Sequence, residues 1–134
     1  MSDWNAPIID EFRANGGQVK AFAGYDVVLL HHVGAKSGTE RVTPLVTRRE
    51  GDDLVIFASY AGAPNHPAWF HNLVANPDVS VELGTETIPV RARVAEGEEH
   101  DRLWTRQKAE VPTFAEYEEK AGGRQIPVIV LERR

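Results

Sequence analysis

The chain has 134 residues, enough for one domain with its own hydrophobic core. With 20 acidic and 15 basic residues its net charge is −5, which argues against nucleic acid as a general partner. Because cysteine is absent, disulfides, thiol redox chemistry and cysteine-based metal sites are excluded.

In the N-terminal half, residues 7–15 have the pattern of a short helix that a proline opens and two glycines end. The β-branched run 26–33 predicts a buried strand, and residues 41–50 its partner across a short turn. Pro44 cannot donate a ladder hydrogen bond, so we expect an edge or a bulge there. Residues 54–59 are apolar nearly throughout, which predicts a third strand covered on both faces.

The middle of the chain predicts a helix followed by a hairpin. The helix is expected to run to about Ala75, with Asn65 as its cap and Pro67 in its first turn. Residues 79–83 and 87–94 are expected to pair across a glycine turn, with their alternate apolar residues facing inward.

The C-terminal part predicts two helices and a last strand. Residues 96–108 are expected to be helical, and the spacing from Thr113 to Glu116 matches a capping box that would open a short helix at 114–120. Residues 126–131 form the last predicted strand. Six strands joined mostly by short turns predict a closed or half-closed antiparallel barrel with peripheral helices, whereas a doubly wound parallel sheet would need regular alternation.

The turn at 34–38 reads Gly-Ala-Lys-Ser-Gly, and Arg41 follows it. Glycines at both ends let the backbone approach a ligand, while Lys36, Ser37 and Arg41 can each donate a hydrogen bond to a phosphate. The spacing is not that of a Walker loop. An ordinary solvated hairpin turn is the alternative, and for a short motif it is the commoner outcome.

Two further segments have the composition of ligand-binding walls. Small residues at 58–63 would let main-chain N–H groups meet a flat ligand edge, although a plain strand-to-helix connection has the same composition. Trp69 and Asn72 lie three apart on the middle helix and would border a pocket, with core packing as the alternative for Trp69. Phe114 and Tyr117 repeat this spacing, and for them too plain packing is the alternative.

The five histidines do not predict a metal site. His31 and His32 are adjacent in a strand and point to opposite faces. His66 and His71 are five apart and do not share a helix face as an i, i+4 pair would. We therefore expect structural or surface roles for them and no bound metal.

Four motifs follow one another between about Val27 and Leu131: the 34–38 turn with Arg41 and Pro44-Leu45, Ala58-Ser59 with Gly62-Ala63, His66-Pro67-x-Trp69-x-x-Asn72-Leu73-x-Ala75-Asn76-Pro77, and Ile126-Pro127-Val128-Ile129-Val130. Together they resemble the deazaflavin-dependent nitroreductase family, small proteins that use coenzyme F420. The resemblance implies a split β-barrel related to FMN-binding flavoreductases. It also implies reduced deazaflavin as hydride donor and quinones or nitroaromatics as acceptors.

The resemblance assigns roles residue by residue. Val111, Phe114 and Tyr117 match the acceptor pocket, and Tyr117 or Ser59 would orient the acceptor or supply a proton. The residues that match the cofactor site are Lys36, Ser37, Gly38, Arg41, Pro44, Ala58, Ser59, Tyr60, Ala61, Gly62, Trp69 and Asn72.

Three departures from the family pattern bear on function. Ala35 stands where the family often has Arg, and Tyr60 where it often has Lys, so two positive charges are missing near the cofactor. Only Tyr117 keeps a phenol in the acceptor pocket, which weakens the case for nitroimidazole activation. Arg13 and Lys20 are the basic residues of the N-terminal segment, too few to support stable membrane association.

We therefore predict one split-barrel cofactor-binding domain over residues 1–134, with a partly mobile helical segment at 1–25. The predicted activity is hydride transfer from reduced F420 to an aromatic acceptor. The alternatives are a non-catalytic deazaflavin carrier and an FMN-dependent reductase. No apolar run approaches the ~20 residues that span a bilayer, and the first residues lack a signal-peptide pattern. We expect a cytoplasmic monomer or homodimer.

Overall fold

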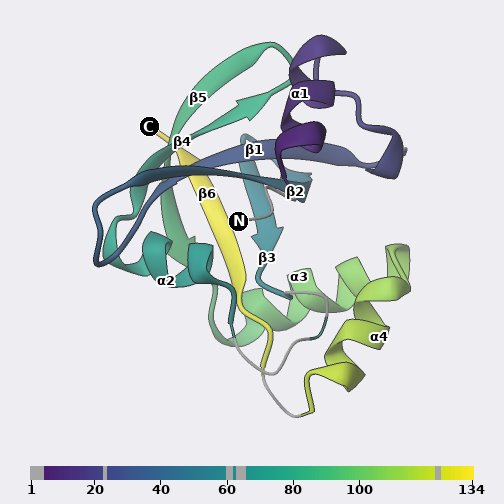
Figure 1. The fold of residues 1–134 in the computed structure, drawn as a ribbon. Helices are drawn as coiled ribbons and strands as arrows, with labels where there is room; N and C mark the ends of the chain where they lie inside the picture. Colours follow the sequence, from purple (N-terminus) through teal and green to yellow (C-terminus); the bar gives the residue numbers. More distant parts are fainter. Residues whose placement is uncertain (1–4, 23, 60–61, 63–65, 123–124) are drawn as a thin grey trace.

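The computed structural model describes residues 5–22, 24–59, 62, 66–122 and 125–134 (Figure 1). In chain order, its elements are α1 (Ala6–Ala14), the 3₁₀ helix η1 (Lys20–Phe22), β1 (Asp26–Val33), β2 (Glu40–Glu50), β3 (Asp53–Phe57), α2 (Ala68–Ala75), β4 (Asp78–Leu83), β5 (Glu86–Val94), α3 (Gly97–Glu110), α4 (Thr113–Lys120) and β6 (Val128–Arg133).

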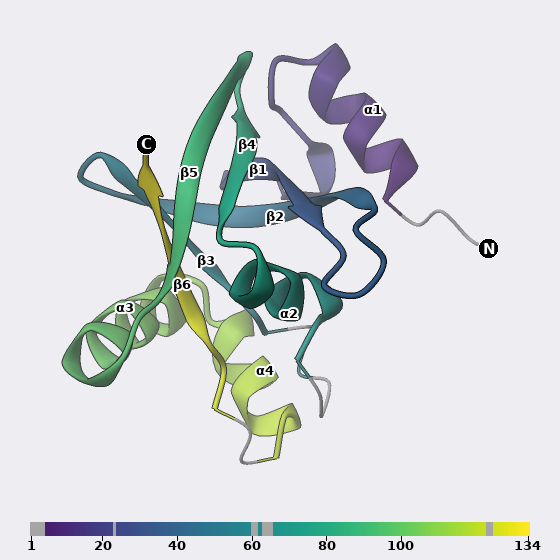
Figure 2. The ribbon, with the colours of Figure 1, turned by 90° about the vertical axis from the view of Figure 1, so that its left-hand side faces the viewer.

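The six strands close into a barrel in the order β1-β2-β3-β6-β5-β4, and every neighbouring pair is antiparallel. The predicted six-stranded antiparallel barrel with peripheral helices is therefore confirmed. Figures 1 and 2 show α1 near one end of the barrel, while α2, α3 and α4 gather toward the other. No helix in the described ranges is long and apolar enough to cross a bilayer.

Alternate strand residues fill the interior of the barrel. Leu30, Ile56 and Leu131 are each at most 1% exposed, and they belong to one apolar cluster. Trp69 and Leu73 of α2 join the same cluster. Burying side chains of this size contributes roughly 1.5–3 kcal/mol each. The packing therefore fixes α2 against the barrel.

The outer faces of the strands carry two further apolar clusters. Val55 and Phe57 of β3 pack with Trp104 of α3 on the side opposite the interior, which confirms the prediction that both faces of this strand are covered. Leu29 of β1 packs with Phe12 of α1. Thus α1 covers one outer face, and α3 with α4 covers another.

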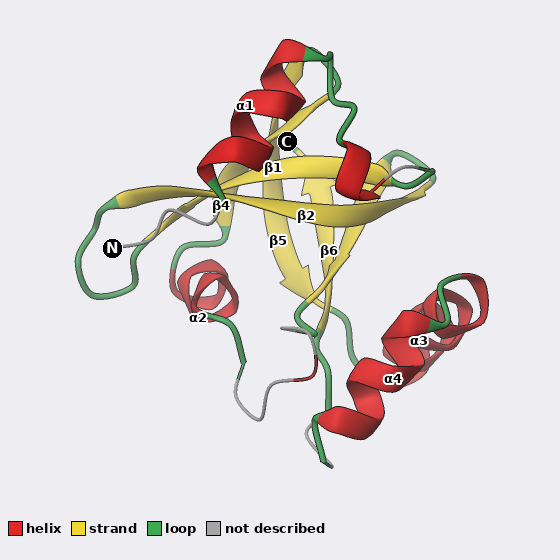
Figure 3. Cartoon of the chain, turned by 45° about the vertical axis from the view of Figure 1, so that its right-hand side comes forward, coloured by secondary structure: helices red, strands yellow, loops and turns green. Residues whose placement is uncertain are grey.

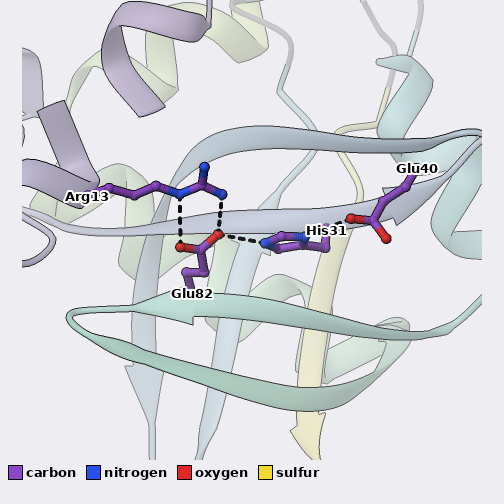
Figure 4. Close-up of polar contacts among 4 residues, drawn as sticks. All are labelled: Arg13, His31, Glu40 and Glu82. Atoms are coloured by element: carbon purple, nitrogen blue, oxygen red, sulfur yellow. Dashed lines mark hydrogen bonds and ion pairs between the residues drawn. The ribbon is translucent and has the colours of Figure 1, made fainter. Parts of the chain in front are cut away.

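Charged contacts also join α1 to the barrel (Figure 4). Arg13 donates to Glu82 of β4 through Nε at 3.2 Å and Nη2 at 2.8 Å. His31 of β1 lies between two carboxylates, with Nε2 2.6 Å from Glu82 and Nδ1 3.3 Å from Glu40. All four side chains lie on the outer face that α1 covers.

Pro44 lies at an open edge and makes no bulge. The β1–β2 register runs without interruption from Asp26 opposite Thr47 to Val33 opposite Glu40. β3 pairs with β2 only over residues 48–50, so β1 is the one strand that pairs with β2 at Pro44. The prediction of an edge or a bulge is thus confirmed, and the structure has the edge, because a missing N–H is harmless where no strand would accept it.

The predicted helix starts need two corrections. Pro67 is the N-cap of α2 and lies one position before the predicted first turn, while Asn65, the predicted cap, is outside the described residues. The capping box is wrong, because α4 begins at Thr113 with Pro112 as N-cap and no side-chain capping bond. Pro112 has φ −56° and ψ −25°, a helical conformation that the proline ring favours, so the helix starts earlier than predicted.

Candidate functional site

The turn between β1 and β2 is closed by its own hydrogen bonds. The Gly34 N–H donates to the Thr39 carbonyl at 2.9 Å, and the Gly38 N–H to the Gly34 carbonyl at 3.0 Å. Ser37 Oγ accepts from the Thr39 N–H at 3.2 Å and lies 2.3 Å from where a Cβ on Gly34 would stand. Position 34 therefore requires glycine, and the Ser37 hydroxyl keeps its hydrogen to donate.

This turn carries cations without acidic partners. Lys36 and Arg41 are exposed and form no ion pair within the part of the chain that is described, whereas Arg48 and Arg93 bind carboxylates. The main-chain N–H groups of Lys36 and Ser37 also lack a hydrogen-bond acceptor there. Two unpaired cations beside free N–H groups suit an anion such as a phosphate.

A buried hydrogen-bond network connects the turn to α2. The Ala35 N–H donates to Asn72 Oδ1 at 2.9 Å, Asn72 Nδ2 lies 2.9 Å from His32 Nδ1, and His32 Nε2 lies 2.9 Å from Thr43 Oγ1. Because an N–H can only donate, Oδ1 must be the acceptor and Nδ2 must donate to His32. The imidazole hydrogen then sits on Nε2 and is donated to Thr43.

The imidazole in this network is neutral at physiological pH. His32 is 2% exposed, and its burial lowers the pKa to about 4, with smaller contributions from the nearby charges of Arg41 and His31. A protonated ring would present an N–H to the Asn72 amide hydrogens. The structure therefore favours an uncharged link between the strands and the helix.

Gly62, in the small-residue segment after β3, lies directly against α4. Gly62 is buried with φ +81°, and a Cβ there would lie 2.5 Å from Lys120 Cβ and 2.9 Å from the Tyr117 carbonyl oxygen. Close packing thus accounts for this glycine. The contact also brings Gly62 beside Tyr117. Ser59 itself is 8% exposed.

Main-chain access to a ligand is limited in the described part of this segment. The Ala58 N–H donates to the Pro127 carbonyl at 3.0 Å, and Ala58 is fully buried. The Gly62 N–H donates to the Ser59 carbonyl at 2.9 Å. Tyr60 and Ala61, also predicted to meet the cofactor ring, lie outside the described residues.

The predicted acceptor residues form part of an aromatic wall. The Phe114 ring lies 5.8 Å from Phe57 and 5.4 Å from Tyr117, and both Phe114 and Tyr117 are partly buried. Val111 is the half-buried C-cap of α3. Packing explains much of the spacing of Phe114 and Tyr117, while the half-exposed position of Tyr117 leaves part of that side chain open to a ligand.

Glu118 is a residue of this wall that the sequence did not identify. Its carboxylate accepts from Trp104 Nε1 at 2.5 Å and from Lys108 Nζ at 2.9 Å, so it joins α4 to α3. The Trp104 hydrogen bond, followed by that of Lys108, lowers the pKa of Glu118. No local pattern pairs position 118 with position 104, so only the fold reveals this contact.

Figure 3 shows α2, α3 and α4 toward the same end of the barrel, and the described site residues form two groups, one at the β1–β2 turn with α2 and one at the end of β3 with α3 and α4. Two residues lie apart from both groups. Trp69 packs in the barrel interior, and Pro44 is buried opposite Leu29 on the face that α1 covers. The first group is Lys36, Ser37, Gly38, Arg41 and Asn72, and the second is Ala58, Ser59, Gly62, Val111, Phe114 and Tyr117.

Two hollows lie on another side of α2. One of 240 Å³ is lined by Phe70, Val74 and Val94 among others, and one of 340 Å³ by residues that include His66 and His100. None of the predicted site residues that the structure describes lines either hollow. Among the described residues, no group of three or more His, Asp or Glu side chains could hold a metal ion.

Comparisons with known proteins identify the family of this chain. A family model described as F420H(2)-dependent quinone reductase matches residues 8–133. An F420H(2)-dependent quinone reductase of Mycobacterium tuberculosis (strain H37Rv) is 39% identical over 110 residues, which are 80% of this chain and 73% of that protein.

Two solved structures have the same fold and related sequences. An F420-H2 dependent reductase is 41% identical with a TM-score of 0.71, over 79% of this chain and 93% of that one. A structure described as a domain-swapped dimer is 36% identical with a TM-score of 0.73, over 97% of this chain and 98% of that one.

These comparisons confirm the resemblance seen in the sequence. The family description names reduced F420 as the reductant, which favours the deazaflavin over FMN as the cofactor. It also describes reductases, which favours an enzyme over a non-catalytic carrier. This chain belongs to the F420H(2)-dependent quinone reductase family and is an F420-dependent oxidoreductase.

Proposed function

We propose that this protein reduces quinones with reduced F420, binding the cofactor phosphate at the β1–β2 turn and the acceptor beside α4. The observation that carries the cofactor half is the pair of cations at the turn, Lys36 and Arg41, which have no acidic partner among the described residues of an acidic chain. Their charges and the adjacent N–H groups fit the anionic end of the cofactor.

The bound deazaflavin supplies the hydride, so the protein contributes position, charge and exclusion of water. Lys36 and Arg41 would hold the phosphate, with Ser37 donating its hydroxyl hydrogen. No dedicated acid or base is needed for the donor half of the reaction.

On the acceptor side, Phe114 and Tyr117 offer aromatic surface to a flat ring. The Tyr117 hydroxyl would orient the acceptor or supply a proton to it, and Ser59 is the second candidate for that role. Val111 and Phe114 carry no phenol, which favours quinones over nitroimidazoles. Nitroaromatic compounds remain a second acceptor class to assay.

The test of the cofactor half is a titration with F420 that follows its fluorescence. Changing Lys36→Ala and Arg41→Ala together removes two charge-assisted hydrogen bonds, and we expect Kd to rise roughly 100-fold. The matched control is Arg49→Ala, which removes a cation of the same strand that is paired with Asp26. An unchanged Kd in the double variant would show that the turn is an ordinary solvated hairpin.

The test of the acceptor half follows F420H2 absorbance in the presence of menadione. Tyr117→Phe keeps the ring and removes the hydroxyl, so we expect turnover to fall several-fold while the Kd for F420 stays the same. Binding of F420 without turnover of any of several quinones would contradict the proposed acceptor.

The assembly is proposed to be a monomer or a homodimer in the cytoplasm. A relative of 36% identity is described as a domain-swapped dimer, which supports the dimer. Val74 and Val94 are 60% and 39% exposed beside the smaller hollow, so an apolar surface is available for contact. Sedimentation equilibrium would distinguish the two states.

A further inference from the structure

The turn that carries Lys36 is joined to α2 by one short hydrogen bond. The Ala35 N–H, directly before Lys36, donates to Asn72 Oδ1 at 2.9 Å. The neighbouring contact from Asn76 Nδ2 to the Val33 carbonyl is 3.5 Å, at the long limit for a hydrogen bond, and it reaches β1 before the turn. Asn72 is therefore the α2 side chain that fixes where the turn sits.

Asn72 is itself held in one orientation. Rotating its amide by 180° would place Nδ2 against the Ala35 N–H, and this contact between two donors would be repulsive. Thr43 holds the far side of the imidazole at 2.9 Å. The three hydrogen bonds point in the same direction along the network, an order in which each polarises the next.

The network contains no formal charge although cations surround it. Arg41 of β2 lies opposite His32 in the register, and Lys36 follows Ala35 in the turn. A charged group at position 32 or 72 would add to or offset the electrostatic field of Lys36 and Arg41 at the turn. The neutral network fixes the turn and leaves the charges of Lys36 and Arg41 to act on the ligand.

We propose that Asn72, held by His32 and Thr43, is a positioning residue that sets the Lys36–Ser37 turn in the geometry that receives the cofactor phosphate. This inference rests on the proposed binding of that phosphate at the turn. Asn72 acts through the main chain of Ala35, since both of its polar groups are already occupied within the protein.

The first measurement is amide hydrogen exchange at Ala35 by NMR, in the full chain without cofactor. Asn72→Leu has a similar volume and no acceptor, so we expect exchange at Ala35 to quicken at least tenfold. Asn72→Asp keeps an oxygen for the Ala35 N–H and is expected to retain slow exchange. Asn76→Ala is the control on the same helix and should leave Ala35 unchanged.

The second measurement is the Kd for F420 in Asn72→Leu and in the control Asn76→Ala. Asn72→Leu should weaken binding roughly tenfold, the effect of one lost hydrogen bond. Asn76→Ala leaves the Ala35 contact in place and should bind F420 like the wild type. Equal weakening in both variants would show that the general packing of α2, and not the Asn72 contact, sets the affinity.

The outcomes separate this inference from the proposed function. Fast exchange at Ala35 in Asn72→Leu, together with a Kd within twofold of the wild type, would overturn the positioning role. This holds even if the Lys36 and Arg41 double variant confirms that the turn binds the cofactor phosphate. If the double variant binds F420 normally, the proposed binding of the phosphate at the β1–β2 turn is itself wrong. Should Asn72→Leu fail to fold, fast exchange at Ala35 in folded Asn72→Asp would overturn the inference.

Discussion

The two neighbouring histidines of β1 point to opposite faces of the strand and have different kinds of hydrogen-bond partner. His32 points inward, is 2% exposed, and takes part in a network of neutral hydrogen bonds with Asn72 and Thr43. His31 points outward, its side chain is 22% exposed, and both ring nitrogens face carboxylates, of Glu82 and Glu40. The inner face is thus stabilised by neutral hydrogen bonds, and the outer face by contacts with charged carboxylates.

The difference follows from water access. An ion in the interior would lose its hydration without full compensation, so burial keeps the inner imidazole neutral. On the outer face the carboxylates of Glu82 and Glu40 stay partly hydrated, so their charges cost less there. The cofactor turn is attached to the inner network, and α1 is attached to the outer one.

The largest expected effect concerns the inner histidine and pH. Because the pKa of His32 is about 4 in the folded protein and 6.5 ordinarily, the unfolded chain binds more protons between these values. Its contribution to stability is complete above pH 6.5 and is lost as the pH falls toward 4. A difference of that size corresponds to roughly 3 kcal/mol.

The matched variants are His32→Gln and His31→Gln, unfolded in urea at a series of pH values from 4 to 7. The first should lose the steep rise of unfolding free energy across this window, while the second should keep it. Equal slopes in both variants would mean that the inner and outer histidines do not differ as described.

The alternation of side chains along a strand allowed the opposite directions of the two histidines to be predicted from the sequence. The run 26–33 was expected as a strand and is one end to end, because β-branched residues and a turn on either side define it locally. The opposite directions of His31 and His32 follow from the period of two, and the structure confirms them. Local periodicity was thus enough to predict the barrel strands.

The partners of each face were not predictable in the same way. Asn72 and His32 are 40 positions apart, and Trp104 and Glu118 meet only because two helices pack together. No local period encodes such contacts. One signal was available and unused: Arg41 and Pro44 are three apart on a strand, so their side chains had to face opposite sides of it.

A smaller effect is expected on the outer face, from Glu82→Gln. Glu82 is 18% exposed and accepts two hydrogen bonds from Arg13, which is 51% exposed, so the loss should be about 1 kcal/mol. The hydrogen bond from Arg13 is the main cause that lowers the pKa of Glu82. Its contribution is therefore present above the ordinary carboxyl range and is lost as the pH falls below about 4.

Salt separates this contact from the inner network. Raising ionic strength from about 0.1 M to 1 M shortens the screening length several-fold, so the cost of Glu82→Gln should shrink. The cost of Thr43→Val, which breaks a neutral hydrogen bond of the inner network, should not change. A salt-insensitive cost at Glu82 would indicate that its packing under α1 matters more than its charge.

The smallest effect is expected from Glu40→Gln, which tests how much each outer carboxylate contributes to the free energy of unfolding. The Glu40 side chain is 69% exposed and 3.3 Å from His31, so removing its charge should cost less than about 0.5 kcal/mol. Glu82 should matter more, because it is less exposed and binds Arg13 as well as His31. The contrary result in urea is an equal loss of unfolding free energy for Glu40→Gln and Glu82→Gln. Their shared partner His31, rather than the Arg13 contact, would then account for the stabilisation by the outer carboxylates. In that case α1 is held mainly by the apolar packing of Phe12.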